Sequence, residues 1–173
     1  GYYSIPGLYR GVAVSGAHLF IVRSGNCSVF DISDPTNPTY LNGFITPGGA
    51  RDIVVSGDYA FVADFLYGLQ VIDISDPFFP QILGTYDTPG LAWSVAVSGD
   101  YVYVSDYNSG LQVIDISDPA SPTLAGSYDT PGSATDVALS GDYAYVADFH
   151  YGLQVIDISD PASPTFAGSY DTP

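Results

Sequence analysis

The chain has 173 residues, of which 46% are hydrophobic and 14% aromatic, so it can bury a core and is too apolar for a disordered segment. Three basic residues against 19 acidic residues give a net charge of −16. This charge argues against nucleic-acid binding, which needs Lys and Arg to neutralise phosphates. No apolar run reaches the roughly 20 residues that a membrane-spanning helix requires.

One unit is repeated four times along the chain. A Pro-Gly pair recurs at intervals of 41 or 42 residues and divides the chain into repeats 6–46, 47–88, 89–130 and 131–173. Residues 1–5 align with the end of a repeat, and we interpret them as the remnant of a strand. The third and fourth repeats agree at 32 of 42 positions, so most positions serve the same structural purpose in every copy.

Each repeat is predicted to contain four short strands. In the fourth repeat these are residues 135–140, 143–148, 153–159 and 165–170. Gly141-Asp142 and Asp160-Pro161 are turn formers between them, because Gly accepts positive φ, Asp caps turns and Pro presets φ. No segment shows a sustained helical period, which predicts an all-β fold.

The strands carry apolar residues on both parities, as in Leu-Gln-Val-Ile-Asp-Ile at 153–158, which predicts sheets covered on both faces. Four-stranded antiparallel sheets with a period of about 42 residues, stacked face to face, are the blades of a β-propeller. A β-solenoid is the second possibility, but its usual period is shorter.

The segments 29–35, 69–77, 111–119 and 153–161, and the Ser-Gly-Asp-Tyr stretches before the last three, resemble the LVIVD repeat. The resemblance covers nearly the whole chain and implies a β-propeller of the kind found in bacterial and archaeal surface or secreted proteins. It implies no catalytic residues. The first repeat departs from the pattern, with Ala17 and His18 in place of Asp-Tyr and Arg23 in place of Asp.

The number of blades leaves three arrangements open. Four repeats could close into a compact ring, form part of a larger ring completed by a second copy or by a longer chain, or associate head to tail in an open assembly. The first repeat has no net charge, whereas the second, third and fourth carry −5, −5 and −6. Because like charges repel least there, we predict contact between the first and fourth repeats, within a ring or between copies.

All 19 acidic residues are Asp and fall in six positions of the repeat. Calcium prefers such oxygen ligands, and the weak candidates are Asp73, Asp76, Asp115, Asp118, Asp157 and Asp160. The interpretation that we favour is turn formation, since only the short Asp side chain reaches its neighbouring backbone. We therefore expect no cofactor, with calcium as the one alternative.

Catalytic motifs are missing from the sequence, and we expect no enzyme. The single cysteine, Cys27, aligns with Leu69 and is predicted to be a small buried hydrophobe. His18 and His150 are interpreted as packing or surface residues.

Differences between nearly identical repeats are not required by the fold and therefore indicate contact surfaces. Phe78 and Phe79 stand where the next repeats have Ala-Ser. We predict a partner interface from these two residues and from the variable positions and basic residues Arg10, Arg23, Arg51, Phe65, Trp93, Tyr67, Tyr107, Phe149 and Tyr151. For Phe78 and Phe79, burial under a local loop is the alternative.

The function expected from these patterns is a non-enzymatic structural module, extracellular or at the cell surface, that makes protein–protein contacts by self-assembly or adhesion. Asn26 begins an Asn-x-Ser sequon, a weak glycosylation candidate in an exported protein. The alternative is a module that binds a small ligand, a glycan or calcium, which predicts polar and aromatic residues converging around Trp93.

Overall fold

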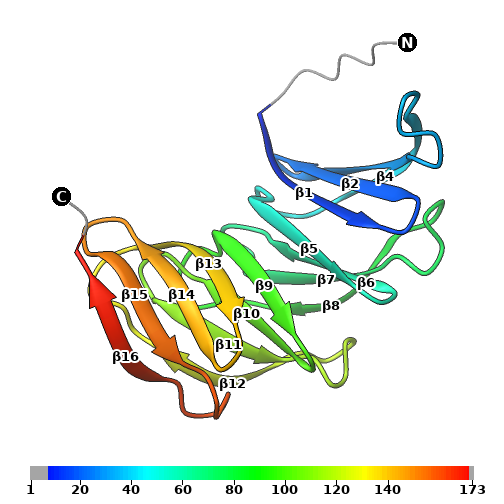
Figure 1. Cartoon of the computed structure of the whole chain (residues 1–173). Helices are drawn as coiled ribbons and strands as arrows, with labels where there is room; N and C mark the ends of the chain where they lie inside the picture. The colour runs from blue at the N-terminus through cyan, green and yellow to red at the C-terminus, as the bar shows by residue number, and fades with distance from the viewer. Residues whose placement is uncertain (1–7, 172–173) are drawn as a thin grey trace.

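The computed structural model describes residues 8–171, and every regular element in this range is a β-strand. Sixteen strands form four antiparallel sheets, one from each repeat (Figure 1). The prediction of an all-β fold of four-stranded sheets is confirmed. Within the described range, no helix could serve as a membrane span. The predicted strand remnant, residues 1–5, lies outside it.

Each sheet is a meander in which the four strands pair in chain order. Sheet 1 contains β1 (Tyr9–Ser15), β2 (His18–Arg23), β3 (Asn26–Asp31) and β4 (Thr39–Ile45). Sheet 2 contains β5 (Asp52–Ser56), β6 (Tyr59–Ala63), β7 (Leu69–Asp73) and β8 (Gln81–Tyr86). Sheet 3 contains β9 (Ser94–Ser98), β10 (Tyr101–Ser105), β11 (Leu111–Asp115) and β12 (Thr123–Tyr128). Sheet 4 contains β13 (Ala134–Ser140), β14 (Tyr143–Asp148), β15 (Gly152–Asp157) and β16 (Thr165–Tyr170).

The strands of sheet 4 end where the sequence predicts, except for the third strand. The first and second strands of sheet 4 are joined at Gly141, whose φ of 56° lies in the left-handed region that glycine favours. The third strand ends at Asp157, whose Oδ1 accepts a hydrogen bond of 2.9 Å from the backbone N–H of Ser159. This bond takes the backbone away from the strand ladder, so β15 ends two residues earlier than predicted.

Three hydrophobic cores lie between consecutive sheets. In the first core, Phe20 and Val29 of sheet 1 pack with Ile53, Val62 and Ile72 of sheet 2. The second and third cores join sheets 2 and 3 and sheets 3 and 4 through equivalent residues. Sheets 2 and 3 are therefore covered on both faces, as predicted, and the apolar residues on both parities of their strands are explained.

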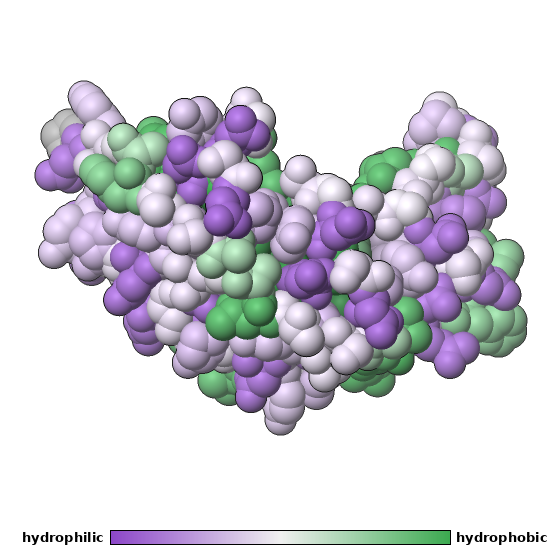
Figure 2. Space-filling model, turned by 90° about the horizontal axis from the view of Figure 1, so that it is seen from below, coloured by the Kyte–Doolittle hydropathy of each residue, from purple (hydrophilic) through white to green (hydrophobic). Residues whose placement is uncertain are grey.

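The four sheets form an open arc. Their first strands, β1, β5, β9 and β13, lie side by side along its inner edge. Figure 1 shows sheets 1 and 4 at the two ends of this arc, well apart from each other. The space-filling view in Figure 2 shows the same curvature as a hollow between two arms. The structure of one chain is therefore not a closed four-bladed ring.

Buried carboxylates tie the linkers between sheets to the second strands. Thr46 Oγ1 donates a hydrogen bond of 2.6 Å to Asp64 Oδ1, and Thr88 Oγ1 donates one of 2.6 Å to Asp106 Oδ1. Burial raises the pKa of both Asp64 and Asp106, and these hydrogen bonds partly offset that effect. The linkers that set the spacing of the sheets are thus held by side chains inside the protein.

Candidate functional site

Each sheet has a leading face towards the preceding repeat and a trailing face towards the next repeat. In sheet 2 the leading face contains Ile53, Val62 and Ile72, and the trailing face contains Phe61 and Val71. Both faces are buried in sheets 2 and 3. At the ends of the arc, the leading face of sheet 1 and the trailing face of sheet 4 have no sheet against them (Figure 1).

The trailing face of sheet 4 is an apolar groove. Val155 is only half-buried, whereas its equivalents Val29, Val71 and Val113 are 0% exposed. The groove has a volume of about 400 Å³, and its lining includes Tyr143, Tyr145, Leu153, Val155 and Tyr170. These side chains are of the kind that fills a core in the other junctions.

The leading face of sheet 1 is open in the same way. Val12 is 62% exposed, whereas its equivalents Ile53 and Val95 are 4% and 5% exposed in the internal junctions. Leu19 and Ile21 are half-buried beside it. The two ends of the arc therefore present the two halves of one internal junction.

A glycine on the fourth strands of sheets 2, 3 and 4 reveals a second part of this junction, whereas sheet 1 has Asn42 at the equivalent position. At Gly84 and Gly126, an added Cβ would collide with the carbonyl oxygens of Pro119 and Pro161, in the loop of the following repeat. At Gly168, the equivalent residue, an added Cβ would meet no atom within 4 Å. Gly168 thus leaves room for a loop that the single chain does not supply.

Near the inner edge of the arc, aromatic and charged side chains line what we call the axial cleft, of about 400 Å³. The Arg51 guanidinium carbon lies 4.3 Å from the centre of the Phe65 ring and 4.1 Å from that of Trp93. Trp93 in turn stacks on Tyr107, with ring centres 5.0 Å apart. The cleft is lined by Tyr9, Arg10, Arg51, Asp52, Trp93, Ser94, Thr135 and Asp136. The structure thus brings together five residues that the sequence predicted at an interface: Arg10, Arg51, Phe65, Trp93 and Tyr107.

The other predicted interface residues are not among those that line the axial cleft. Phe78 and Phe79 are 52% and 70% exposed on the loop between β7 and β8, where the backbone oxygen of Phe78 accepts a hydrogen bond from the Asn42 side chain. Tyr67 and Phe149 are exposed on the loops after β6 and β14. Arg23 ends β2 and pairs in register with Tyr9 and Asn26 of the neighbouring strands.

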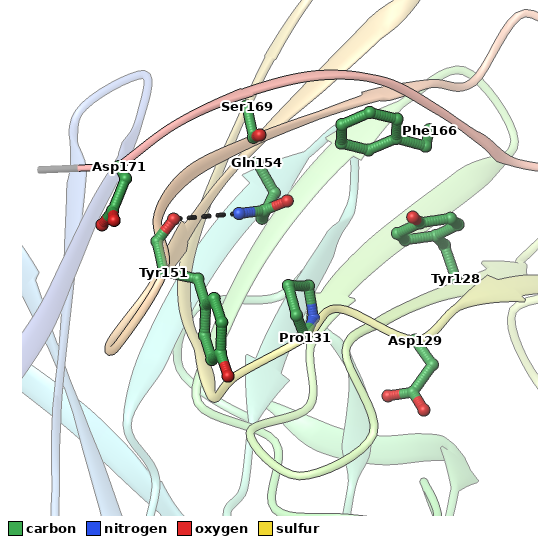
Figure 3. A pocket seen from close by; sticks show the side chains of 8 residues that line it. All are labelled: Tyr128, Asp129, Pro131, Tyr151, Gln154, Phe166, Ser169 and Asp171. Carbon is green, nitrogen blue, oxygen red and sulfur yellow. Dashed lines mark hydrogen bonds between the residues drawn. The ribbon is translucent and has the colours of Figure 1, made fainter.

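Tyr151 borders a second pocket, of about 450 Å³, between the end of sheet 3 and the leading face of sheet 4 (Figure 3). Its backbone oxygen accepts a hydrogen bond of 3.0 Å from Gln154 Nε2. The lining includes Asp129 and Asp171, and the aromatic rings of Tyr128 and Phe166 lie on one side of the view.

The side chains of the six calcium candidates accept hydrogen bonds within backbone turns. In each repeat the first Asp of the Asp-x-Ser-Asp segment, such as Asp73, accepts a hydrogen bond from the N–H two residues later. The second, such as Asp76, does the same. Within residues 8–171, no group of three or more His, Cys, Asp or Glu side chains is arranged to hold a metal ion.

The Cys27 thiol and the two histidine rings lie against neighbouring residues of the fold. Cys27 is buried in the first core, and burial raises the pKa of its thiol to about 12. His18 is half-buried opposite Asp31, and His150 is exposed against the ring of Phe149. Asn26 is half-buried at the start of β3.

Sequence reasoning missed two features of these sites. One is the open position at Gly168, although the recurrence of Gly84 and Gly126 at the equivalent positions was a signal for it. The other is Ser94, whose Oγ lies 2.7 Å from Asp52 Oδ2 and 2.8 Å from Asp136 Oδ1. No local pattern indicates that link, because its partners are each 42 residues away.

Stacked four-stranded meanders with their first strands along an inner edge define a β-propeller-type protein. The family model described as LVIVD repeat matches residues 6–46, 47–88, 89–130 and 131–172. The chain therefore belongs to the LVIVD repeat family. No curated protein matches its sequence.

Solved structures share the fold at low sequence identity. The computationally designed Ika4 protein is 13% identical with a TM-score of 0.76, over 92% of this chain and 96% of that chain. The β-propeller domain of Cps50 (Swd1) from Myceliophteria thermophila is 14% identical with a TM-score of 0.74, over 95% of this chain and 58% of that chain. A functionally unknown protein from Desulfotomaculum acetoxidans is 15% identical with a TM-score of 0.80, over 95% and 56%. This chain thus spans a little more than half of the last two.

Proposed function

We propose that the protein is a non-enzymatic structural module that assembles with a second copy of itself. The trailing face of sheet 4 in one copy packs on the leading face of sheet 1 in the other. The observation that carries this proposal is that the same two faces are buried in all three internal junctions and are open only at the ends of the arc. Two such contacts close two arcs into one ring of eight sheets.

The internal junctions indicate what the contact between copies contains. Asp52 Oδ2 accepts a hydrogen bond of 3.1 Å from the backbone N–H of Val95 in the next repeat. Asp136 and Val12 hold the equivalent positions at the two ends, so we expect Asp136 to accept from Val12 of the second copy. Gly168 is expected to receive the loop at Pro35, as Gly126 receives Pro161.

Charge and size support this pairing. The first repeat has two Arg and two Asp, whereas the fourth has six Asp and no basic residue, so this end-to-end contact avoids the repulsion between two acidic repeats. The chain also covers 58% of a solved β-propeller domain, so two copies together have about the length of one such domain.

The test is the mass in solution, measured by light scattering over a range of concentrations. We expect twice the chain mass of 18.2 kDa for the unmodified protein. Gly168→Ala is expected to shift the protein towards the monomer, because the added Cβ fills the space for the loop while touching nothing in a single copy. Thr165→Ser, on the same strand but outside the groove, is the control and should leave the mass unchanged, because the equivalent Thr123 stays exposed beside an internal junction.

The outcomes separate the possibilities. A monomer at every concentration would overturn the proposal and leave the faces to be covered by something other than a second copy. A dimer unaffected by Gly168→Ala would show that the copies meet elsewhere. Mass that grows without limit, with filaments in negative-stain images, would retain the contact but contradict ring closure.

The exposed pair Phe78 and Phe79 does not take part in this contact, because its loop lies on sheet 1 of the same chain. The prediction that it docks another subunit or partner stands separately. Replacing the pair by the Ala-Ser of the third repeat should weaken any assembly that is larger than the head-to-tail dimer. Unchanged association would count against that role.

We place the module outside the cell or on its surface. The support is the resemblance to surface and secreted repeat proteins and the acidic, lysine-free composition. Protease treatment of intact cells that produce the protein from its native gene should remove it. Protection until the cells are lysed would contradict this location.

A further inference from the structure

The axial cleft gathers the differences between repeats that the fold does not require. One position at the start of the first strand holds Arg10, Arg51, Trp93 and Thr135 in the four repeats, and all four side chains line the cleft. The variable loops after β6 and β10 contribute Phe65 and Tyr107, which contact this row through Arg51 and Trp93. A different residue from each repeat thus builds one shared concave site.

Aromatic rings hold Arg51 in the cleft. Its guanidinium lies within 4.3 Å of the centres of two rings, Phe65 and Trp93, and the Tyr107 ring stacks on Trp93. Stacking uses the flat faces of a guanidinium and leaves the N–H groups at its edge able to bind an oxyanion in a bidentate manner. A positioned arginine of this kind is suited to a carboxylate or a phosphate.

Arg10 lies close enough to Arg51 for its charge to act on it. Burial, and then the charge of Arg10, lower the pKa of Arg51. The protein has only three basic residues and a net charge of −16, and two of these residues line the same cleft. Two neighbouring guanidinium groups repel each other, and a bound anion relieves that repulsion.

The two carboxylates of the cleft differ in how far donors of the protein engage them. Asp52 Oδ1 accepts from the N–H of Ile53 at 2.8 Å, and its Oδ2 accepts from Ser94 and Val95. Asp136 Oδ1 accepts from Val137 at 2.9 Å, and its side chain is exposed at the border of the cleft. Asp52 is therefore engaged within the protein, and the arginine pair can bind an external anion. Asp136 Oδ2 has two lone pairs, so it can accept a hydrogen bond from a hydroxyl group of that anion even when the N–H of Val12 of the second copy is bound.

We propose that the axial cleft binds a small hydroxylated oxyanion, of the class of sugar acids and sugar phosphates. Arg10 and Arg51 bind the anionic group, and Asp136 binds a hydroxyl group. A volume of about 400 Å³ is that of a small-molecule site. The cleft lies within one chain, so this inference does not rest on assembly with a second copy.

The test compares three probes that share a pyranose ring and differ at its sixth carbon: glucose, glucuronate and glucose 6-phosphate. Binding is measured by isothermal titration calorimetry and by the rise in melting temperature at millimolar probe. We expect glucuronate or glucose 6-phosphate to bind and glucose not to bind. The stronger of the two anions identifies whether the natural ligand carries a carboxylate or a phosphate.

Matched variants use residues that the protein already accepts at the same position. Arg10→Thr and Arg51→Thr place the residue of the fourth repeat there, and each should weaken anion binding about tenfold or more. Thr123→Ser, on an outer strand, is the control. The measurements are repeated with Gly168→Ala, so that a failure of self-assembly does not affect the outcome.

Three results would overturn the inference. Equal binding of glucose and glucuronate would show that the arginine pair does not select the ligand. Full anion binding by both Arg→Thr variants would place the ligand elsewhere. No binding of either anion at millimolar concentration would show that the cleft is not a site for this class of ligand.

Discussion

Val113 and Val155 occupy equivalent positions, one in an internal junction and one at the open end of the arc. The free energy of unfolding that is lost when each is shortened to Ala therefore measures how far each face is covered. Val113 is 0% exposed in the third core. Val113→Ala removes two methyl groups, each worth about 0.8 kcal/mol of burial, and leaves a small cavity. The expected cost is about 2 kcal/mol, or about 4–8 °C in melting temperature for a domain of this size.

Val155→Ala is expected to cost less than half as much in a single copy, because Val155 is only half-buried there. Once a second copy covers the trailing face of sheet 4, its cost should approach that of Val113→Ala. The assay is thermal unfolding followed by circular dichroism, at concentrations below and above the one at which the mass doubles. Equal costs for the two variants at low concentration would refute the open arc, and a cost for Val155→Ala that does not change with concentration would refute the contact.

Three further predictions concern stability and reactivity. Thr88→Val removes the hydroxyl donor to buried Asp106 and should cost about 1–3 kcal/mol in urea unfolding, whereas a neutral result would show that water replaces the hydroxyl. Cys27 should react with a thiol reagent at neutral pH only as fast as the protein opens, and immediate labelling of the native protein would contradict its burial. Hydrogen bonds in turns lower the pKa of five carboxyls, so their stabilisation is present above the ordinary value of 3.8 and is lost as the pH falls below it. Asp64 and Asp106 have raised pKa values, so their contribution to stability changes above pH 3.8 and is constant below it. The melting temperature should therefore decrease as the pH falls below 3.8, and an increase there would contradict the assignment. The five carboxyls are those of Asp31, Asp34, Asp73, Asp115 and Asp157.

The fold could be predicted from the sequence because the same turn and strand patterns recur in all four repeats. Gly at the first turn and Asp at the end of the third strand fix the strand boundaries, and the predicted strands of the fourth repeat agree with the structure to within two residues. The covering of both faces followed from the apolar residues on both parities of each strand. The turn interpretation of the Asp-x-Ser-Asp segments also agrees with the hydrogen bonds, such as the 2.9 Å bond from Ser75 N–H to Asp73.

The curvature of the array was not accessible in the same way. Whether four sheets close on themselves depends on the small rotation between neighbours, which is set by side-chain packing such as that of Phe61 in the second core and leaves no periodic signal. The axial cleft was anticipated only in part. Variation indicated Arg51 and Trp93, but their stacking with Phe65 and Tyr107 depends on loops that follow different strands.

The first repeat indicates that the leading face of sheet 1 is covered by another sheet. It has diverged most from the others, so recent copying does not explain what it retains. Even so, its leading face keeps Val12, Leu19, Ile21 and Phe30, although no sheet of the same chain covers them. Other positions of the same strands have changed, with His18 in place of Tyr and Arg23 in place of Asp. A face that stays apolar while neighbouring positions change is consistent with burial against another sheet, and the trailing face of sheet 4 in a second copy has the matching apolar surface.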